Sequence, residues 1–164
     1  MKSLTIVRHA KSSWKHHGLT DRERPLNKRG ERDAPIMAKR VAETGIRPSQ
    51  IISSPAVRAW TTAKIFAREL GYPAEFLQRE DGLYLASLDN LLDVVATQDP
   101  GFNHLMLFGH NPGLTDFANY LVPRLTSNLP TSGVVSVNLE TDDWMLYDRP
   151  PTELALHDYP KKQP

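Results

Sequence analysis

Four side chains carry the clearest chemical signal in the sequence. Arg8 and His9 directly follow one short apolar run, His110 comes just after another, and Arg58 lies shortly after a third. A guanidinium group binds oxyanions through a fixed fork of donors, and an imidazole can act as a nucleophile or a base. A phosphoryl group carries roughly −1.5 to −2 charges and three acceptor oxygens. Two arginines and two histidines around one point would therefore bind such a group and attack it.

Each of these residues also has a structural explanation. An Arg-His pair at a strand end is often a solvated edge or part of a local ion pair. Arg58 can serve only to pair with a carboxylate, and a lone histidine beside a helix start is usually structural. The chemical interpretation therefore depends on whether the elements of the fold bring the four side chains together.

The apolar pattern predicts that they do. Strands are expected at 4–7, 50–54 and 105–108, and the last run is continuously apolar, as in a strand buried on both faces. Each strand is followed by polar residues and then by a helical pattern. Side chains at the carboxyl ends of parallel strands meet in the crevice where ligands bind. Arg8, His9, Arg58 and His110 should lie at this edge.

Helices are predicted over 28–44, from Pro55 to about 70, around 88–95, and from Pro112 to about 121, from apolar residues at helical spacing. Gly45 is expected just past the end of the first helix, and Pro35 either in its first turn or at a kink. Ser54 and Asn111, each followed by proline, are expected to be N-caps.

Alternating strands and helices predict an α/β fold, a three-layer sandwich with a mostly parallel central sheet and helices on both faces. A further strand is expected at 74–77, and an antiparallel hairpin from 134–139 and 144–147 near the C-terminus. Residues 1–150 should form a single domain. Residues 151–164 should be a tail that hugs the surface or is disordered.

Composition narrows the class of function. The chain has 164 residues, no cysteine and a net charge of +1, which fits a globular protein of a reducing, cytoplasmic compartment. Up to residue 68 there are 15 Lys and Arg against 5 Asp and Glu. These cations are scattered, without an aromatic stripe, so we expect an anionic ligand in a pocket rather than nucleic acid or a membrane. His16 and His17 lack a third residue at metal-ligand spacing and are expected to be a surface pair.

Several separated motifs resemble one known family. Arg8-His9-Ala10 looks like the RHG signature of the histidine phosphatase superfamily, with alanine in third place. Four further segments resemble its SixA-like phosphohistidine phosphatase branch, and the resemblance covers about residues 2–147: Lys11-Ser12-Ser13-Trp14, Arg24-Pro25-Leu26-Asn27 with Arg29-Gly30, Ser53 to Arg58 with Thr62-Ala63, and Gly109-His110-Asn111-Pro112-Gly113.

The resemblance implies a role for each residue. His9 would be the nucleophile that forms a phosphohistidine intermediate, and Arg8, Arg58 and His110 would bind the phosphoryl oxygens. Many relatives place a general acid in the loop after the third strand, where this chain has Glu80 and Asp81; both could equally be solvated loop residues or caps. Asp21 is a weaker candidate for the acid. No metal or cofactor is expected.

Three further residues are candidates for substrate binding: Lys11, Ser12 and Asn111. Ser12 could equally cap a turn, and Lys11 could simply be solvated. The leading expectation is a metal-independent phosphatase that acts on phosphohistidine in a protein partner. The alternatives are a phosphatase of small phosphate esters and, in a different class, a non-catalytic phosphate-binding module.

Overall fold

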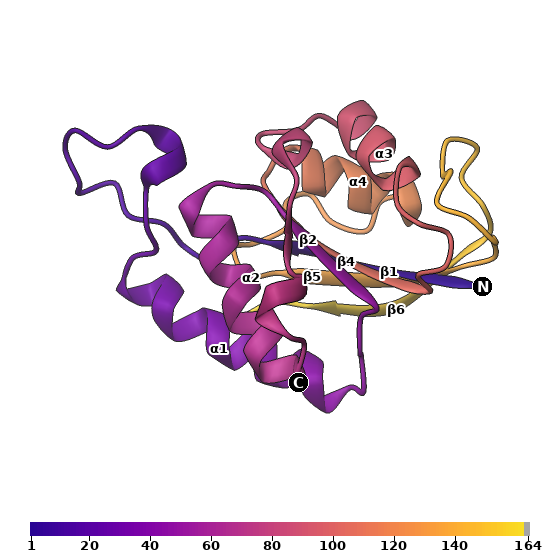
Figure 1. The fold of residues 1–164 in the computed structure, drawn as a ribbon, viewed down its shortest axis with the longest axis horizontal. Helices are drawn as coiled ribbons and strands as arrows, with labels where there is room; N and C mark the ends of the chain where they lie inside the picture. Colours follow the sequence, from indigo (N-terminus) through magenta and orange to yellow (C-terminus); the bar gives the residue numbers. More distant parts are fainter. Residues whose placement is uncertain (163–164) are drawn as a thin grey trace.

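One six-stranded mixed sheet forms the centre of the protein, whose residues 1–162 are described by a computed structural model (Figure 1). The strand order is β3-β2-β4-β1-β5-β6. The strand bounds are β1 Lys2–Arg8, β2 Gln50–Ser53, β3 Gln78–Arg79, β4 His104–Gly109, β5 Val134–Leu139 and β6 Thr152–Asp158. The predicted α/β class with a mostly parallel centre is confirmed.

The parallel part of the sheet aligns the carboxyl ends of three strands. β1 and β2 each pair in parallel with β4, and Arg8 lies opposite Gly109 while Ser53 lies opposite Phe108. The pairing continues one residue past the strand ends, because the His9 N–H donates to the Gly109 carbonyl (3.1 Å) and the Ser54 N–H to the Phe108 carbonyl (3.0 Å). The residues that follow β1, β2 and β4 therefore emerge side by side.

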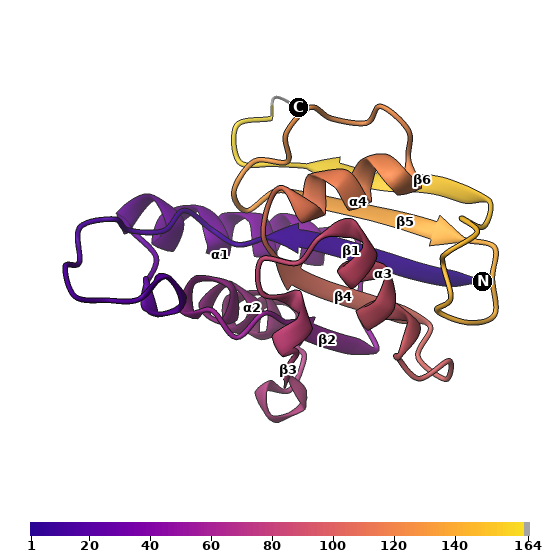
Figure 2. The same ribbon diagram turned by 90° about the horizontal axis from the view of Figure 1, so that it is seen from above.

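Helices cover both faces of the sheet, as predicted. α1 (Lys28–Glu43) and α2 (Val57–Leu70) lie on one face, and α3 (Leu88–Ala96) and α4 (Gly113–Leu121) lie on the other (Figures 1 and 2). Three short 3-10 turns occupy Asp21–Glu23, Ala74–Phe76 and Asp81–Leu83. No helix within residues 1–162 is long and apolar enough to cross a membrane.

A separate apolar core lies on each side of the sheet. Ile6 of β1 points to the side of α3 and α4, where Phe117 and Trp144 are fully buried. Val7 points to the opposite side, where it packs with Met37 and Phe66 of α1 and α2. This alternation along β1 is that of a strand buried on both faces. The central strand is thereby fixed in register, and so are the residues that follow it.

The helix boundaries agree with the sequence prediction except at three positions. Gly45 follows α1 with a φ of +88°, as expected for a residue just past a helix end. Pro35 lies inside α1 and not in its first turn, so of its two predicted placements the kink stays a prediction. Ser54 and Asn111 are not the N-caps of α2 and α4, because those helices begin later, at Val57 and Gly113. The Ser54 side chain instead binds His110, whereas Asn111, two residues before α4, still accepts from the first-turn N–H of Thr115 and also donates to the Leu129 carbonyl.

Two strand predictions are wrong. Residues 74–76 form a 3-10 turn after Pro73, and the strand beside β2 is the two-residue β3. Residues 144–147 are not a strand: Trp144 and Leu146 are buried in the core, so their alternation reflects burial rather than sheet pairing.

The antiparallel partner of β5 is β6, which lies in the segment predicted to be a tail. Its residues are mostly exposed or half-buried, as suits an edge strand, and the apolar signal there is therefore weak. The sheet thus extends past residue 150. The last two residues of the predicted tail lie outside the described residues.

Candidate active site

Arg8, His9, Arg58 and His110 line one open pocket of about 260 Å³ at the carboxyl edge of the sheet. The imidazole rings of His9 and His110 are 5.2 Å apart between centroids and tilted by 55°. Both rings and the Arg58 side chain are buried, while Arg8 is half-buried. The structure therefore brings together the four residues that the sequence singles out.

The His9 ring is held in one orientation. Its Nδ1 lies 2.7 Å from the carbonyl oxygen of Ala10, and because a carbonyl can only accept, Nδ1 carries the hydrogen. The backbone N–H of Ala10 in turn donates to Thr62 Oγ1 at 3.0 Å, which ties this segment to α2. Nε2 is then the nitrogen with the free lone pair.

Burial keeps the His9 imidazole neutral. Desolvation is the largest cause that lowers the pKa of His9 to about 3, and the positive charges of Arg58, Arg8 and Arg24 lower it further. The hydrogen bond to Ala10 acts in the opposite direction but is outweighed. At neutral pH the His9 ring is a neutral base with a free lone pair on Nε2.

His110 is fixed by a hydroxyl group. Its Nε2 lies 2.7 Å from Ser54 Oγ, and this oxygen also accepts from the Ala56 N–H at 3.2 Å. The Ser54 hydroxyl keeps its own hydrogen for donation to Nε2, and in that arrangement His110 carries its ring hydrogen on Nδ1. That Nδ1 is buried and has no partner within residues 1–162. Burial, followed by the charges of His9 and Arg58, lowers the pKa of His110 to about 3.

The two predicted arginines retain free donors. Arg8 donates from Nη1 to the Leu129 carbonyl at 3.0 Å, and its buried Nε has no partner in the described chain. Arg58 donates from Nη1 to the Asp21 carbonyl (2.7 Å) and from Nη2 to the Asp21 carboxylate (2.9 Å), while its buried Nε is likewise unpartnered. Arg58 therefore forms the carboxylate pair that the sequence left open as an alternative, and it does so inside the pocket.

The Asp21 carboxylate lies between the side chains of two arginines. Its carboxylate accepts hydrogen bonds from Arg58, Arg24 and the Tyr84 hydroxyl. Partial burial by itself raises the pKa of Asp21, but the hydrogen bonds from Tyr84, Arg58 and Arg24 outweigh it and lower the pKa to about 2. Asp21 is therefore ionised at neutral pH and presents an anion where a substrate's oxygens would meet Arg58.

Arg24 is a site residue that the sequence reasoning missed as such. It is buried, lines the pocket, and donates from Nη1 to Ser12 Oγ (2.9 Å) and to the Ser13 carbonyl (3.2 Å). Its guanidinium lies 3.5 Å from the ring centroid of Trp14. The available signal was its place in the segment Arg24-Pro25-Leu26-Asn27, where the apolar Leu26 marks the point at which a polar loop returns to the core.

The remaining predicted residues fall into two groups. Lys11, Ser12 and Asn111 line the pocket, although Asn111 also accepts from the Thr115 N–H (3.2 Å) and donates to the Leu129 carbonyl (2.9 Å), as a structural residue does. Glu80 and Asp81 do not line it. Glu80 is half-buried and its N–H binds the Ser53 carbonyl at 2.9 Å, while Asp81 is exposed. Their role as general acid stays a prediction.

The fold and the convergent site define a class of protein. The family model described as "Histidine phosphatase superfamily (branch 1)" matches residues 4–84, which include His9 and Arg58. The chain belongs to this superfamily, and the coarse activity that the family and its solved members indicate is that of a phosphatase.

Within the superfamily the chain is SixA-like. It shares 27% identity and a TM-score of 0.82 with the structure of SixA from Agrobacterium tumefaciens, covering 97% of this chain and 98% of that one. A structure of the protein histidine phosphatase SixA complexed with tungstate has the same fold (TM-score 0.78, 20% identity, 96% and 97% covered). An uncharacterized chloroplastic protein of Arabidopsis thaliana is 32% identical over 130 residues, 73% of this chain, and the match spans 59% of that relative's length.

Proposed function

We propose that this protein is a metal-independent phosphatase that removes the phosphoryl group from a phosphohistidine of a partner protein, with His9 as the nucleophile. The observation that carries the proposal is the His9 ring itself. Its Nδ1–H is bound to the Ala10 carbonyl and its pKa is about 3, so a neutral Nε2 lies in a pocket lined by cationic side chains. A nucleophilic imidazole needs this combination of tautomer and charge state.

In the first step, Nε2 of His9 attacks phosphorus in line, a new N–P bond forms, the P–N bond to the substrate imidazole breaks, and the leaving imidazole takes a proton from solvent. Arg8 and Arg58 hold the phosphoryl oxygens, and the Nδ1–H of His110 donates to one of them. These donors stabilise the charge on the oxygens as the bond order around phosphorus changes. The unpartnered Arg8 Nε, Arg58 Nε and His110 Nδ1 are the groups available for this task.

In the second step, water attacks the phosphoryl group on His9, the N–P bond breaks, and inorganic phosphate leaves.

The leaving nitrogen of a phosphoramidate is easily protonated, so we propose that phosphohistidine requires no protein acid. Asp21, with a pKa of about 2, is ionised at neutral pH and is unsuited to donate a proton. Glu80→Gln and Asp81→Asn variants test this: turnover of a phosphohistidine substrate should stay within about twofold of wild type.

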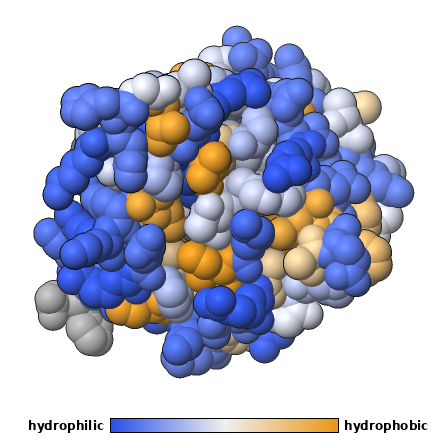
Figure 3. Space-filling model, turned by 60° about the vertical axis from the view of Figure 1, so that its left-hand side comes forward, coloured by the Kyte–Doolittle hydropathy of each residue, from blue (hydrophilic) through white to orange (hydrophobic). Residues whose placement is uncertain are grey.

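The mouth of the pocket supports a protein as the substrate. Trp14 and Leu85 line it and expose 75% and 56% of their surface. Figure 3 shows the end of the molecule that carries the 9–27 loop, where separate hydrophobic patches lie among hydrophilic side chains. Exposed aromatic and aliphatic residues beside an open site suit contact with a protein surface. We further propose a cytoplasmic location, and neither nucleic acid nor a membrane as partner.

Rapid-quench labelling tests the proposal. The enzyme is mixed with a phosphohistidine protein bearing ³²P, and phosphate that is acid-labile and alkali-stable should appear on wild-type enzyme but not on His9→Ala. Turnover of the phosphohistidine protein should exceed turnover of a panel of sugar and nucleotide phosphates. Turnover of the panel alone would identify a small-molecule phosphatase, and absence of label with every substrate would identify a phosphate-binding module.

A further inference from the structure

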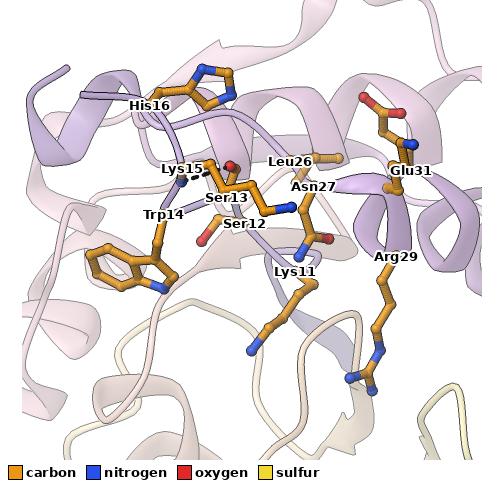
Figure 4. A pocket seen from close by; sticks show the side chains of 11 residues that line it. Lys11, Ser12, Ser13, Trp14, Lys15, His16, Leu26, Asn27, Arg29 and Glu31 are labelled. Carbon is orange, nitrogen blue, oxygen red and sulfur yellow. Dashed lines mark hydrogen bonds between the residues drawn. The ribbon is translucent and has the colours of Figure 1, made fainter. Parts of the chain in front are cut away.

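A second cleft, of about 630 Å³, adjoins the candidate active site. It lies between the segment 11–16, which follows β1, and the segment 26–31, which enters and begins α1 (Figure 4). Lys11, Ser12 and Trp14 line both this cleft and the pocket around His9. The two hollows therefore form one continuous surface, and a chain whose phosphoryl group lies at His9 can extend into the cleft.

The cleft is positively charged. Lys11, Lys15, Lys28 and Arg29 line it, and Glu31 is the single acidic residue among those that do. Figure 4 shows the carboxylate of Glu31 pointing away from the ends of Lys11 and Arg29. The three lysines have no carboxylate within ion-pair distance anywhere in residues 1–162, whereas Arg29 approaches Asp33 at 3.5 Å. Most of the positive charge of the cleft is therefore not paired with a carboxylate.

The floor of the cleft is rigid. The two segments are joined by backbone hydrogen bonds from Asn27 N–H to the Lys11 carbonyl (3.0 Å) and from Ser13 N–H to the Pro25 carbonyl (2.8 Å). A Cβ atom at Gly30 would lie 2.2 Å from the Lys11 carbonyl oxygen, so the first turn of α1 packs directly on this backbone. The lysine side chains therefore project from a fixed frame, which reduces the entropic cost of binding an extended ligand.

We infer that this cleft binds an acidic segment of the partner protein, next to the phosphohistidine whose phosphoryl group lies against His9. The inference rests on the proposed function and names the feature of the substrate that this surface would select. Several cations spread over a wide, open cleft match carboxylates spaced along a polypeptide, while a small ligand is usually enclosed on most of its surface. A small molecule with a second phosphate is the alternative that the test must separate.

Two phosphohistidine peptides of equal length test the inference, one with Asp and Glu flanking the phosphohistidine and one with Asn and Gln in their place. For wild type at low ionic strength, kcat/KM should be about 3- to 10-fold higher for the acidic peptide, the size expected for two or three exposed ion pairs. The ratio should fall toward one in 0.5 M salt and in the Lys15→Gln/Lys28→Gln variant. Lys39 lies on α1, as Lys28 does, but lines neither the cleft nor the pocket around His9. The Lys39→Gln variant should therefore keep the wild-type ratio of kcat/KM values between the two peptides.

Each other outcome has a distinct meaning. A ratio near one in wild type, or a ratio that survives the double substitution, overturns the inference while leaving the phosphatase proposal intact. Lysine-dependent preference for a bisphosphate over a monophosphate ester, without preference between the peptides, shows that a small anion occupies the cleft instead. If neither peptide is dephosphorylated, the proposed function fails. Fluorescence anisotropy of a labelled, unphosphorylated acidic peptide still tests the cleft, because lysine-dependent binding is independent of turnover.

Discussion

The two buried histidines should make the stability of this protein strongly pH-dependent. Replacing one of them should remove about half of the loss in the free energy of unfolding that the pair causes between pH 7 and pH 5. His9 and His110 each have a folded-state pKa of about 3, against 6.5 for an exposed histidine. Between pH 3 and pH 6.5 these two positions bind more protons in the unfolded chain than in the folded one. Stability is therefore fully present above pH 6.5 and is lost as pH falls through that value toward 3.

The magnitude follows from the two pKa values. Between pH 7 and pH 5 an unfolded histidine goes from about one quarter to nearly complete protonation, while the folded ring stays neutral. Each ring then accounts for a loss of about 2 kcal/mol in the free energy of unfolding, or about 4 kcal/mol for the pair. Desolvation is the largest cause for both, so either ring should keep most of its share when the other is replaced.

Urea denaturation of wild type and His110→Gln at pH 7 and pH 5 measures this share. The variant should lose about 2 kcal/mol less than wild type between the two pH values, because glutamine does not titrate. Other titrating groups, including the half-buried His104, cancel in this difference. His17→Gln, at an exposed loop position, controls for removal of one histidine. A variant that loses as much stability as wild type would show that the His110 ring is not held neutral by burial.

Three further predictions concern the site. His9→Ala should lose turnover by at least about 10³-fold because His110, the other imidazole that lines the pocket, has its Nε2 hydrogen-bonded to Ser54 Oγ, while the circular dichroism spectrum of the variant stays that of wild type. Treatment with EDTA should leave kcat/KM unchanged, and a large loss that Mg²⁺ restores would contradict the proposed countercharge by Arg8 and Arg58. Asp21→Asn should lower the inhibition constant for inorganic phosphate several-fold, since the carboxylate no longer competes for Arg58; an unchanged constant would mean that phosphate binds without displacing Asp21.

The sequence predicted the central part of the fold because its signals there are local and strong. Short runs of strand-forming residues identified β1 and β2, a continuously apolar run identified β4, and helical spacing identified α1 to α4. The errors lie where local pattern and tertiary role diverge. Trp144 and Leu146 alternate because they fill the core, and β6 is a strand only because β5 offers a free edge. No pattern within 151–164 could show that partner.

The two residues that precede α2 and α4 at the site also show how a local sequence pattern can differ from the role of a residue in the folded protein. Ser54 and Asn111 each precede a proline and are typical N-caps by sequence. In the structure the Ser54 hydroxyl binds His110, and Asn111 spans Thr115 and Leu129. The contacts of Ser54 with His110 and of Asn111 with Leu129 join residues far apart in the sequence, which a local pattern cannot show, whereas the bond from the Thr115 N–H to Asn111 is local.

By itself, the sequence determined which chemistry was available: two arginines and two histidines at or shortly after strand ends, without cysteine, on an α/β pattern whose parallel strands must share one edge. Tertiary structure alone decided the charge state of that chemistry. Burial against other segments holds His9 and His110 neutral, the Ala10 carbonyl selects the His9 tautomer, and the folded-back loop places Asp21 between Arg58 and Arg24. Proton affinity depends on solvation and on nearby charges, and both are properties of the packed chain.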